Sequence, residues 1–369
     1  MPESATNSIY VTSPYLPPMG DYLKYVEKIW QSKQLTNNGP LVQELEVRLK
    51  EFLGVRHCLV VSSGTIALQL AIKALGLHGS LITTPFSFVA TSSVILWEGC
   101  NPIYADVDRQ SLCLDPNLIE DALTPDTSAI LATHVYGYPC AVEKIQQIAD
   151  RRGLKVIYDA AHAFGVKYKG QSLLNYGDIS TLSFHATKLF HTVEGGAVIT
   201  NDDELAERVF FMRNFGIKNE SEFDGLGINA KCSEFHAAMG LCILPYVPEI
   251  ISRRKKLSEL YNSLFQRKNN MHIPIPPNIE YNYPYYPIFF SDEASLLEVL
   301  VALNNKNIFP RRYFYPTLNN LTYVEKQKTP IAEDLSSRVL CLPLYHKLTE
   351  SECNCIFEVI NSILTNAKQ

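Results

Sequence analysis

The chain lacks the features of a membrane, secreted or nucleic-acid-binding protein. No apolar run approaches the roughly 18 residues needed to cross a bilayer. Residues 1–7 have neither the basic flank nor the apolar core of a signal peptide. The net charge of -5 gives no electrostatic attraction to nucleic acid or to an anionic membrane. These absences predict a cytoplasmic protein with no nucleic-acid or membrane partner.

Paired cysteines are also lacking. The nine cysteines are scattered, and only Cys353 and Cys355 lie close together, inside an amphipathic helical pattern. A zinc site requires Cys-x-x-Cys pairs or nearby histidines, so no metal site is predicted. Buried free thiols in a reducing compartment explain these cysteines better.

What the chain has is the composition of a soluble globular enzyme. Of its residues, 46% are hydrophobic and 19% are charged. Its length of 369 residues is enough for one large domain and a smaller one. Pro245 and Pro248 mark the expected boundary. We predict a large α/β domain with an N-terminal helical segment over residues 1–245, and a small C-terminal α+β domain over residues 246–369.

Short apolar strands alternate with helices in the first of these regions. The expected strands cover residues 58–62, 80–84, 102–106, 129–134, 154–159, 179–185 and 196–200. The expected helices between and after them cover residues 64–75, 88–97, 116–123, 141–151 and 202–214. This alternation predicts βαβ units and a mostly parallel central sheet covered by helices on both faces. A further helix is expected at 250–268, and its run Arg253-Arg-Lys-Lys256 predicts a solvated face.

Polar residues follow several of these strands, and ligands bind at the carboxyl ends of strands in such a sheet. Gly64 and Thr65 begin a helix whose free N–H groups suit a phosphate, although an ordinary Ser/Thr cap explains the same residues. Phe88 either stacks on a ligand ring or fills the core. Asp159 is the last residue of an apolar strand, where a buried carboxylate requires a cation or hydrogen-bond donors. It either binds such a partner or caps a helix. Lys188 is either an exposed loop residue or a reactive amine.

Together these residues supply the parts that hold pyridoxal phosphate (PLP), which requires a Schiff-base lysine and an acidic partner for its ring nitrogen. The chain resembles the sugar aminotransferases of the DegT/DnrJ/EryC1/StrS family, within the fold type I PLP enzymes. The matching motifs follow the family's order over nearly the whole chain: Leu-Thr-Asn-Asn-Gly-Pro at 35–40, Ser-Gly-Thr at 63–65, Thr-Pro-Phe-Ser-Phe-Val-Ala-Thr at 84–91, Asp-Ala-Ala-His-Ala at 159–163, Ser-Phe-His-Ala-Thr-Lys at 183–188, Glu-Gly-Gly at 194–196, Gly-Ile-Asn at 227–229 and Leu-Cys-Leu-Pro-Leu at 340–344.

The resemblance implies a role for each matching residue. Lys188 would be the Schiff-base lysine, Asp159 the partner of the pyridine N–H, and Phe88 the aromatic residue stacked on the ring. The other implied cofactor ligands are Gly64, Thr65 and Ser183 at the phosphate, and His162 near the ring oxygen. Asn229 would reach the phosphate of a neighbouring subunit, which implies a homodimer with shared active sites. The implied sugar-nucleotide contacts are Asn38, His185, Arg311, Arg312 and Tyr315.

The resemblance also implies a reaction, in which the amino group of L-glutamate is transferred to a nucleotide-linked keto-sugar. Lysine at position 188, rather than histidine, favours transamination over removal of a hydroxyl group. The chain looks closest to enzymes that aminate C-4 of dTDP-4-keto-6-deoxy-D-glucose, and their product would feed O-antigen or antibiotic glycosylation. Amination of a dTDP-linked 3-keto isomer, a UDP-linked keto-sugar or scyllo-inosose remains open, as does a non-enzymatic PLP-binding regulator.

Overall fold

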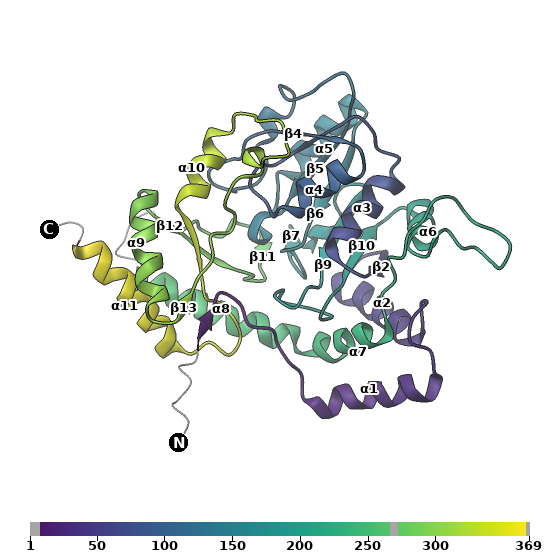
Figure 1. Ribbon diagram of the computed structural model, residues 1–369, viewed down its shortest axis with the longest axis horizontal. Coiled ribbons are helices and arrows are strands. Elements are labelled where there is room, and N and C mark those ends of the chain that lie inside the picture. The colour runs from purple at the N-terminus through teal and green to yellow at the C-terminus, as the bar shows by residue number, and fades with distance from the viewer. Residues whose placement is uncertain (1–7, 266–271, 367–369) are drawn as a thin grey trace.

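The computed structural model describes residues 8–265 and 272–366 (Figure 1). Its centre is a seven-stranded sheet. The strands are, in spatial order, β2 (His57–Val61), β10 (Gly196–Thr200), β9 (Ile179–Ser183), β6 (Lys155–Asp159), β5 (Thr127–Thr133), β3 (Ser80–Thr83) and β4 (Asn101–Tyr104). Only β10 is antiparallel to its neighbours. The predicted mostly parallel central sheet is confirmed.

Both faces of this sheet are buried, because successive strand residues enter two different cores. Val60 and Ile82 point to one side, where α2 (Pro40–Leu53), α5 (Val142–Arg152) and α7 (Glu234–Ile243) pack. Leu59 and Leu81 point to the other side, against α3 (Gly64–Ala74), α4 (Ala90–Trp97) and α6 (Asp203–Met212). Burial of each side chain of this size contributes about 1.5–3 kcal/mol to the free energy of folding. The alternation explains why these strands read as continuous apolar runs.

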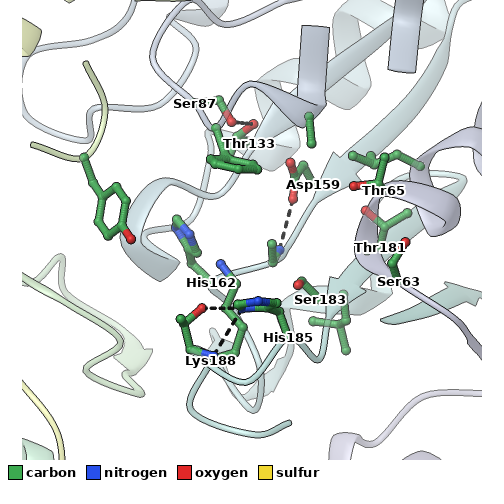
Figure 2. A pocket seen from close by; sticks show the side chains of 18 of the residues that line it. Ser63, Thr65, Ser87, Thr133, Asp159, His162, Thr181, Ser183, His185 and Lys188 are labelled. Atoms are coloured by element: carbon green, nitrogen blue, oxygen red, sulfur yellow. Dashed lines mark hydrogen bonds between the residues drawn. The ribbon is translucent and has the colours of Figure 1, made fainter. Parts of the chain in front are cut away.

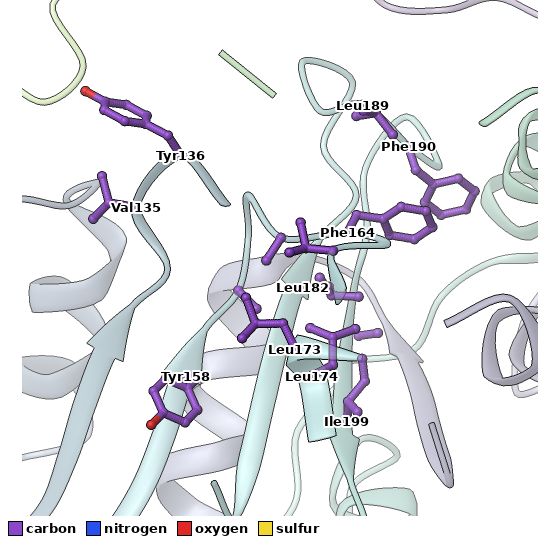
Figure 3. Close-up of a cluster of buried hydrophobic side chains, with 14 of the residues drawn as sticks. Val135, Tyr136, Tyr158, Phe164, Leu173, Leu174, Leu182, Leu189, Phe190 and Ile199 are labelled. Atoms are coloured by element: carbon purple, nitrogen blue, oxygen red, sulfur yellow. The ribbon is translucent and has the colours of Figure 1, made fainter. Parts of the chain in front are cut away.

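The first core continues around the far ends of β6 and β9. Phe164 stacks on Phe190 at 4.5 Å between ring centroids, and Phe184 meets Phe190 edge-on at 4.9 Å. Figure 3 shows Phe164 and Phe190 above Leu182 and Ile199 of the sheet. This packing fixes the segment between β9 and β10, which carries Lys188.

The C-terminal part has a core of its own. The antiparallel pair β12 (Tyr286–Phe289) and β14 (Val339–Leu342) packs with α8 (Val247–Phe265), α9 (Glu293–Asn304) and α11 (Glu350–Asn366). Short β1 (Ile9–Tyr10) pairs with β13 (Ile308–Phe309), so the start of the described chain joins this part. The domain boundary near residue 245 stays a prediction.

The remaining elements are short or peripheral. They are α1 (Met19–Ser32), α10 (Pro330–Arg338), and the small sheet of β7 (Lys167–Tyr168), β8 (Gln171–Ser172) and β11 (Ile279–Glu280). In Figure 1 a long loop projects beyond α6, away from the C-terminal helices. The expected end of the 250–268 helix, residues 266–268, lies outside the described residues.

Two sequence-based expectations are wrong. The helix expected at 116–123 is only a 3-10 turn, Pro116–Leu118, capped by Asp115. The N–H groups that follow bond to carbonyls three residues back, as from Ala122 to Ile119 and from Leu123 to Glu120, and so form 3-10-type turns instead of an α-helix. The basic run on α8 is not wholly solvated. Arg254 is buried, and its guanidinium donates to the carbonyls of Tyr283 and Pro284.

Eight of the nine cysteines are buried, and Cys355 on α11 is exposed. Within residues 8–265 and 272–366, no group of three His, Cys, Asp or Glu side chains could hold a metal ion. One helical stretch in that part, Glu234–Phe265, is long and apolar enough to cross a membrane by length and composition. Half of its most apolar window is buried inside the protein, as in the core helix of a folded domain.

Candidate active site

A cavity of about 370 Å³ opens at the carboxyl ends of the central strands (Figure 2). The loops after β2, β3, β5, β6 and β9 supply one wall, as the rule for open parallel sheets requires. Tyr285, Arg311, Tyr313 and Phe314 of the C-terminal part supply the opposite wall. The cavity therefore lies between the two halves of the chain.

Lys188 occupies the turn after β9, where its N–H donates to the carbonyl of His185 at 2.8 Å. Figure 2 shows its side chain projecting into the cavity beside His162. The Lys188 Nζ atom lies 6.0 Å from the ring centroid of Tyr285. Burial lowers the pKa of Lys188, although the charges of Asp159 and Tyr313 oppose that shift. Burial therefore favours the neutral amine, which is the nucleophilic form.

Asp159, at the end of β6, is buried beneath the same cavity. Its Oδ1 accepts from the N–H of Ala161 at 3.1 Å, and its Oδ2 accepts from the Thr91 hydroxyl at 3.0 Å. Hydroxyl contacts continue from Thr91 to Ser87 and from Ser87 to Thr133. Burial raises the pKa of Asp159, and these donors and Lys188 counteract it. The carboxylate is oriented, and it still has room for a cationic partner from the cavity.

His162 forms another part of the floor. Its Nδ1 accepts from the N–H of Tyr136 at 3.2 Å, so the neutral ring carries its proton on Nε2. Burial and the nearby Lys188 lower its pKa well below the usual range. The ring of Phe314 stacks parallel to the His162 imidazole at 5.7 Å. His162 therefore acts as a neutral hydrogen-bond donor held in one orientation.

The N-terminus of α3 borders the cavity with unused backbone donors. The Ser63 hydroxyl accepts from the N–H of Ile66 at 3.1 Å, which leaves the first N–H groups, those of Gly64 and Thr65, available to a ligand. A Cβ on Gly64 would lie 2.8 Å from the Cβ of Ser183, so only glycine allows this approach. A phosphate can thus meet the helix start and the Ser183 hydroxyl together.

These residues fit PLP. The α3 start suits its phosphate, and the oriented carboxylate of Asp159 suits a protonated ring nitrogen. Lys188 suits its aldehyde carbon. Phe88 lines the same cavity and is 56% exposed, which leaves its ring free to cover a flat ligand.

The residues expected to bind the sugar nucleotide are dispersed. His185 and Arg311 line the cavity that holds Lys188. Arg312 and Tyr315 line a neighbouring cavity of about 590 Å³. Asn38 lines neither cavity, and neither does Asn229, which the resemblance places at the phosphate of a neighbouring subunit. The Asn38 side chain accepts from Arg213 at 3.2 Å, and Asn229 is exposed in a bridge with Asn214.

Some residues of the site were missed from sequence. Thr91 and Ser87, which support Asp159, lie inside the motif at 84–91 but carry no local signal of that role. Tyr285 and Tyr313 reach the cavity from more than 90 residues beyond Lys188 in the chain. Only the tertiary fold brings them to Lys188.

A fold type I core with a partly buried lysine that shares a cavity with a buried aspartate defines a PLP-dependent enzyme. The model of the DegT/DnrJ/EryC1/StrS aminotransferase family matches residues 19–361, and the chain belongs to this family. The predictions of an aminotransferase, rather than a non-enzymatic regulator, and of PLP as its cofactor are confirmed.

Individual relatives agree with this assignment. A dTDP-4-amino-4,6-dideoxy-D-glucose transaminase of Shigella dysenteriae is 42% identical over 362 residues, covering 96% of this chain and 99% of its own length. An Escherichia coli protein of the same name is 43% identical over 362 residues, covering 93% and 95%. The solved structure of DesI in the presence of its TDP-sugar product superimposes with a TM-score of 0.92 at 32% identity, over 98% of this chain and 95% of that one.

Proposed function

We propose that this enzyme transfers the amino group of L-glutamate to C-4 of dTDP-4-keto-6-deoxy-D-glucose and so forms dTDP-4-amino-4,6-dideoxy-D-glucose. The observation that carries the proposal is the partly buried side chain of Lys188, which shares one cavity with Asp159 and with a helix start that has free N–H groups for a phosphate. The names of the two relatives above 40% identity support the choice of sugar and carbon.

Four groups of the chain would hold PLP. The N–H groups at the start of α3 and the Ser183 hydroxyl would bind its phosphate. The Asp159 carboxylate would accept from its ring N–H, and the Nε2–H of His162 would donate to its ring oxygen. When bound, PLP supplies an electron sink that allows a proton to leave the carbon next to the transferred nitrogen.

Lys188 would carry the proton in both stages of the reaction. Its Nζ would take a proton from the carbon that bears the nitrogen and deliver it to the carbon on the other side of that nitrogen, as general base and then general acid. Burial favours the basic form by lowering the pKa of Lys188. Phe88 and Tyr313 line the cavity and help to exclude water from this transfer.

We infer further that two copies assemble into a homodimer with shared active sites. The loop beyond α6 exposes a set of large apolar side chains, which a water-soluble chain normally covers at an interface: Phe215, Ile217, Phe223, Leu226 and Ile228. Asn229 ends this loop and lines neither cavity of its own chain. An active site completed by the partner copy would use it.

We place the reaction in the cytoplasm, where nucleotide-activated sugars would serve as substrates, and its product in O-antigen or other glycan assembly. The negative net charge supports a small-molecule enzyme over a nucleic-acid-binding regulator.

The decisive experiment combines purified enzyme and PLP with L-glutamate and dTDP-4-keto-6-deoxy-D-glucose, followed by NMR of the sugar product. We expect an amine at C-4 together with stoichiometric 2-oxoglutarate. Parallel reactions with the dTDP-linked 3-keto isomer and a UDP-linked keto-sugar test the competing substrates. Amination of either competitor, with none at C-4 of the dTDP sugar, would disprove the proposed substrate.

A further inference from the structure

The cavity around Lys188 is lined by Arg311, for which the family resemblance implies a sugar-nucleotide contact and nothing further. Lys188 serves the cofactor, and His162 is neutral because its Nδ1 accepts a backbone hydrogen bond. His185 has a protein partner, since its Nε2 lies 3.6 Å from Glu194. Arg311 also lines the cavity, and in the described residues no carboxylate lies within ion-pair distance of its guanidinium.

Arg311 is held in a definite place. Its backbone forms a two-way bridge with Cys341 of β14, at 3.2 and 2.8 Å. Arg311 lies near the phenol of Tyr313, which borders the same cavity, and it counteracts the rise that burial gives the pKa of Tyr313. The backbone carbonyl of Tyr313 accepts in turn from the buried hydroxyl of Tyr136. The backbone of Arg311 is therefore fixed, and its exposed guanidinium lies beside Tyr313 before any ligand arrives.

The neighbouring Arg312 provides a contrast. Its guanidinium pairs with Glu293 at 2.6 Å, donates to the carbonyl of Ser337 at 2.8 Å, and stacks 3.4 Å above the ring of Tyr315. Arg312 is thus committed to the protein itself. Arg311 differs because it is unpaired, and because it lines both the 370 Å³ cavity and the 590 Å³ cavity beside it.

Both substrates of the proposed function bring a negative charge to this site, and the inference rests on that function. Glutamate has a second carboxylate remote from its amino group, and a nucleotide sugar has a diphosphate. The two molecules occupy the site in turn, because the amino group waits on the cofactor between them. The planar guanidinium fork binds either carboxylate or phosphate through paired hydrogen bonds.

We propose that Arg311 is a shared anion receptor, which binds the distal carboxylate of the amino donor in one half-reaction and the diphosphate of the nucleotide sugar in the other. Tyr313 is its positioning residue. One consequence is that the two substrates exclude each other, although one is an amino acid and the other a sugar nucleotide. A high concentration of either substrate therefore inhibits the step that needs the other.

The test measures binding of glutarate and of dTDP to the PLP-loaded enzyme by calorimetry, each alone and in the presence of the other. We expect the two probes to compete in the wild-type enzyme. Arg311→Gln should weaken the binding of both probes by roughly 10- to 100-fold, which corresponds to the loss of hydrogen bonds to a charged group. Arg311→Lys should restore part of each affinity, and Tyr313→Phe should weaken both by roughly 2- to 10-fold.

Two control variants separate this role from general damage. Arg109→Gln breaks an exposed ion pair with Asp334 and should leave both affinities unchanged. Arg312→Gln should lower the melting temperature while competition between the probes persists. In steady-state kinetics, Arg311→Gln should raise the KM for both substrates more than it lowers kcat.

Simultaneous binding of both probes to the wild-type enzyme would overturn the proposal, as would an Arg311→Gln variant that loses affinity for only one of them. Wild-type turnover separates the two claims. If the keto-sugar is not aminated but glutarate and dTDP still compete through Arg311, the proposed substrate fails and the shared receptor stands.

Discussion

Lys188 and Asp159 face one cavity, and burial moves their pKa values in opposite directions. Burial lowers the pKa of the lysine and raises that of the aspartate, because it disfavours each charged form. Their mutual attraction opposes both shifts. A bound cofactor with a protonated ring nitrogen would stabilise the carboxylate, so the site gains charge balance when it is loaded.

Replacing Lys188 by alanine should severely impair amino transfer. We expect turnover to fall on the order of 10²–10⁴-fold, the range associated with a positioned proton-transfer group. The measurement is 2-oxoglutarate release under saturating substrates. The matched control is Lys73→Ala, since Lys73 forms only a partly exposed ion pair with Glu98. Full turnover in Lys188→Ala would refute the assignment.

The lowered pKa of Lys188 gives a pH prediction for the cofactor-free protein. Only the neutral amine attacks an aldehyde, so the rate of PLP capture should rise with pH and reach its plateau below the ordinary lysine value of 10.5. Stopped-flow absorbance measures this rate. A rate that still increases up to pH 10.5 would show an ordinary exposed lysine.

Sequence reasoning found the residues that stand immediately after strands and missed those that act from a distance. Asp159, Lys188 and Gly64 follow apolar strands, so the parallel sheet alone predicts that they gather at one edge. Tyr285 and Tyr313 approach from the C-terminal part, and no local pattern encodes that approach. Arg254 was predicted to be solvated because its neighbours in the chain are charged, yet the loop before Tyr285 buries it.

At the scale of elements, α3 and α8 each fix part of the cavity. The start of α3 packs so closely on β9 and β10 that a Cβ on Gly196 would lie 2.6 Å from the carbonyl carbon of Ser63. The buried guanidinium of Arg254 on α8 ties down the carbonyls just before Tyr285. One element thus shapes the phosphate end, and the other supports the wall opposite Lys188.

Gly64→Ala tests the start of α3. The added methyl group would overlap Ser183, and overpacking of this kind costs about 1–3 kcal/mol. If this cost falls on cofactor binding, PLP should bind roughly tenfold or more weakly, because about 1.4 kcal/mol corresponds to a tenfold change in affinity. Cofactor titration and thermal melting provide the measurement. Gly20→Ala on α1 is the control, because nothing lies within 4 Å of its added Cβ. Unchanged PLP affinity in Gly64→Ala would exclude a phosphate site here.

Arg254→Ala tests α8. Removing a buried guanidinium that satisfies two carbonyls should lower the free energy of unfolding by about 2–4 kcal/mol. Turnover should also fall as Tyr285 moves. Arg253→Ala is the adjacent control, and because Arg253 is partly exposed it should cost less than about 1 kcal/mol. Equal losses from the two variants in urea unfolding would contradict the distinction.

At the scale of the whole molecule, the fold class was predictable because each strand is buried on both faces and reads as an apolar run. The antiparallel insertion of β10 between β2 and β9 was not predictable, since periodicity carries no strand order. The same is true of the pairing between β1 and β13, which joins residues almost 300 positions apart.

The dimer proposal also belongs to this scale. The double variant Phe223→Asp with Leu226→Asp should sediment as a monomer and should abolish turnover. Both side chains are exposed in the loop beyond α6, and a charged aspartate in their place would disfavour burial of this loop in a dimer interface. Trp97→Asp is the control, since Trp97 is 82% exposed on a different element. A double variant that remains dimeric would move the interface elsewhere on the surface.

The distribution of cysteines has a practical consequence. Eight thiols are buried and Cys355 alone is exposed, so a maleimide dye should react with a single position on α11 under native conditions. Each copy then carries one fluorophore without any engineered residue. Energy transfer between identical dyes would lower their fluorescence polarisation when two labelled copies associate. Fluorescence polarisation of the labelled native protein would therefore report its assembly.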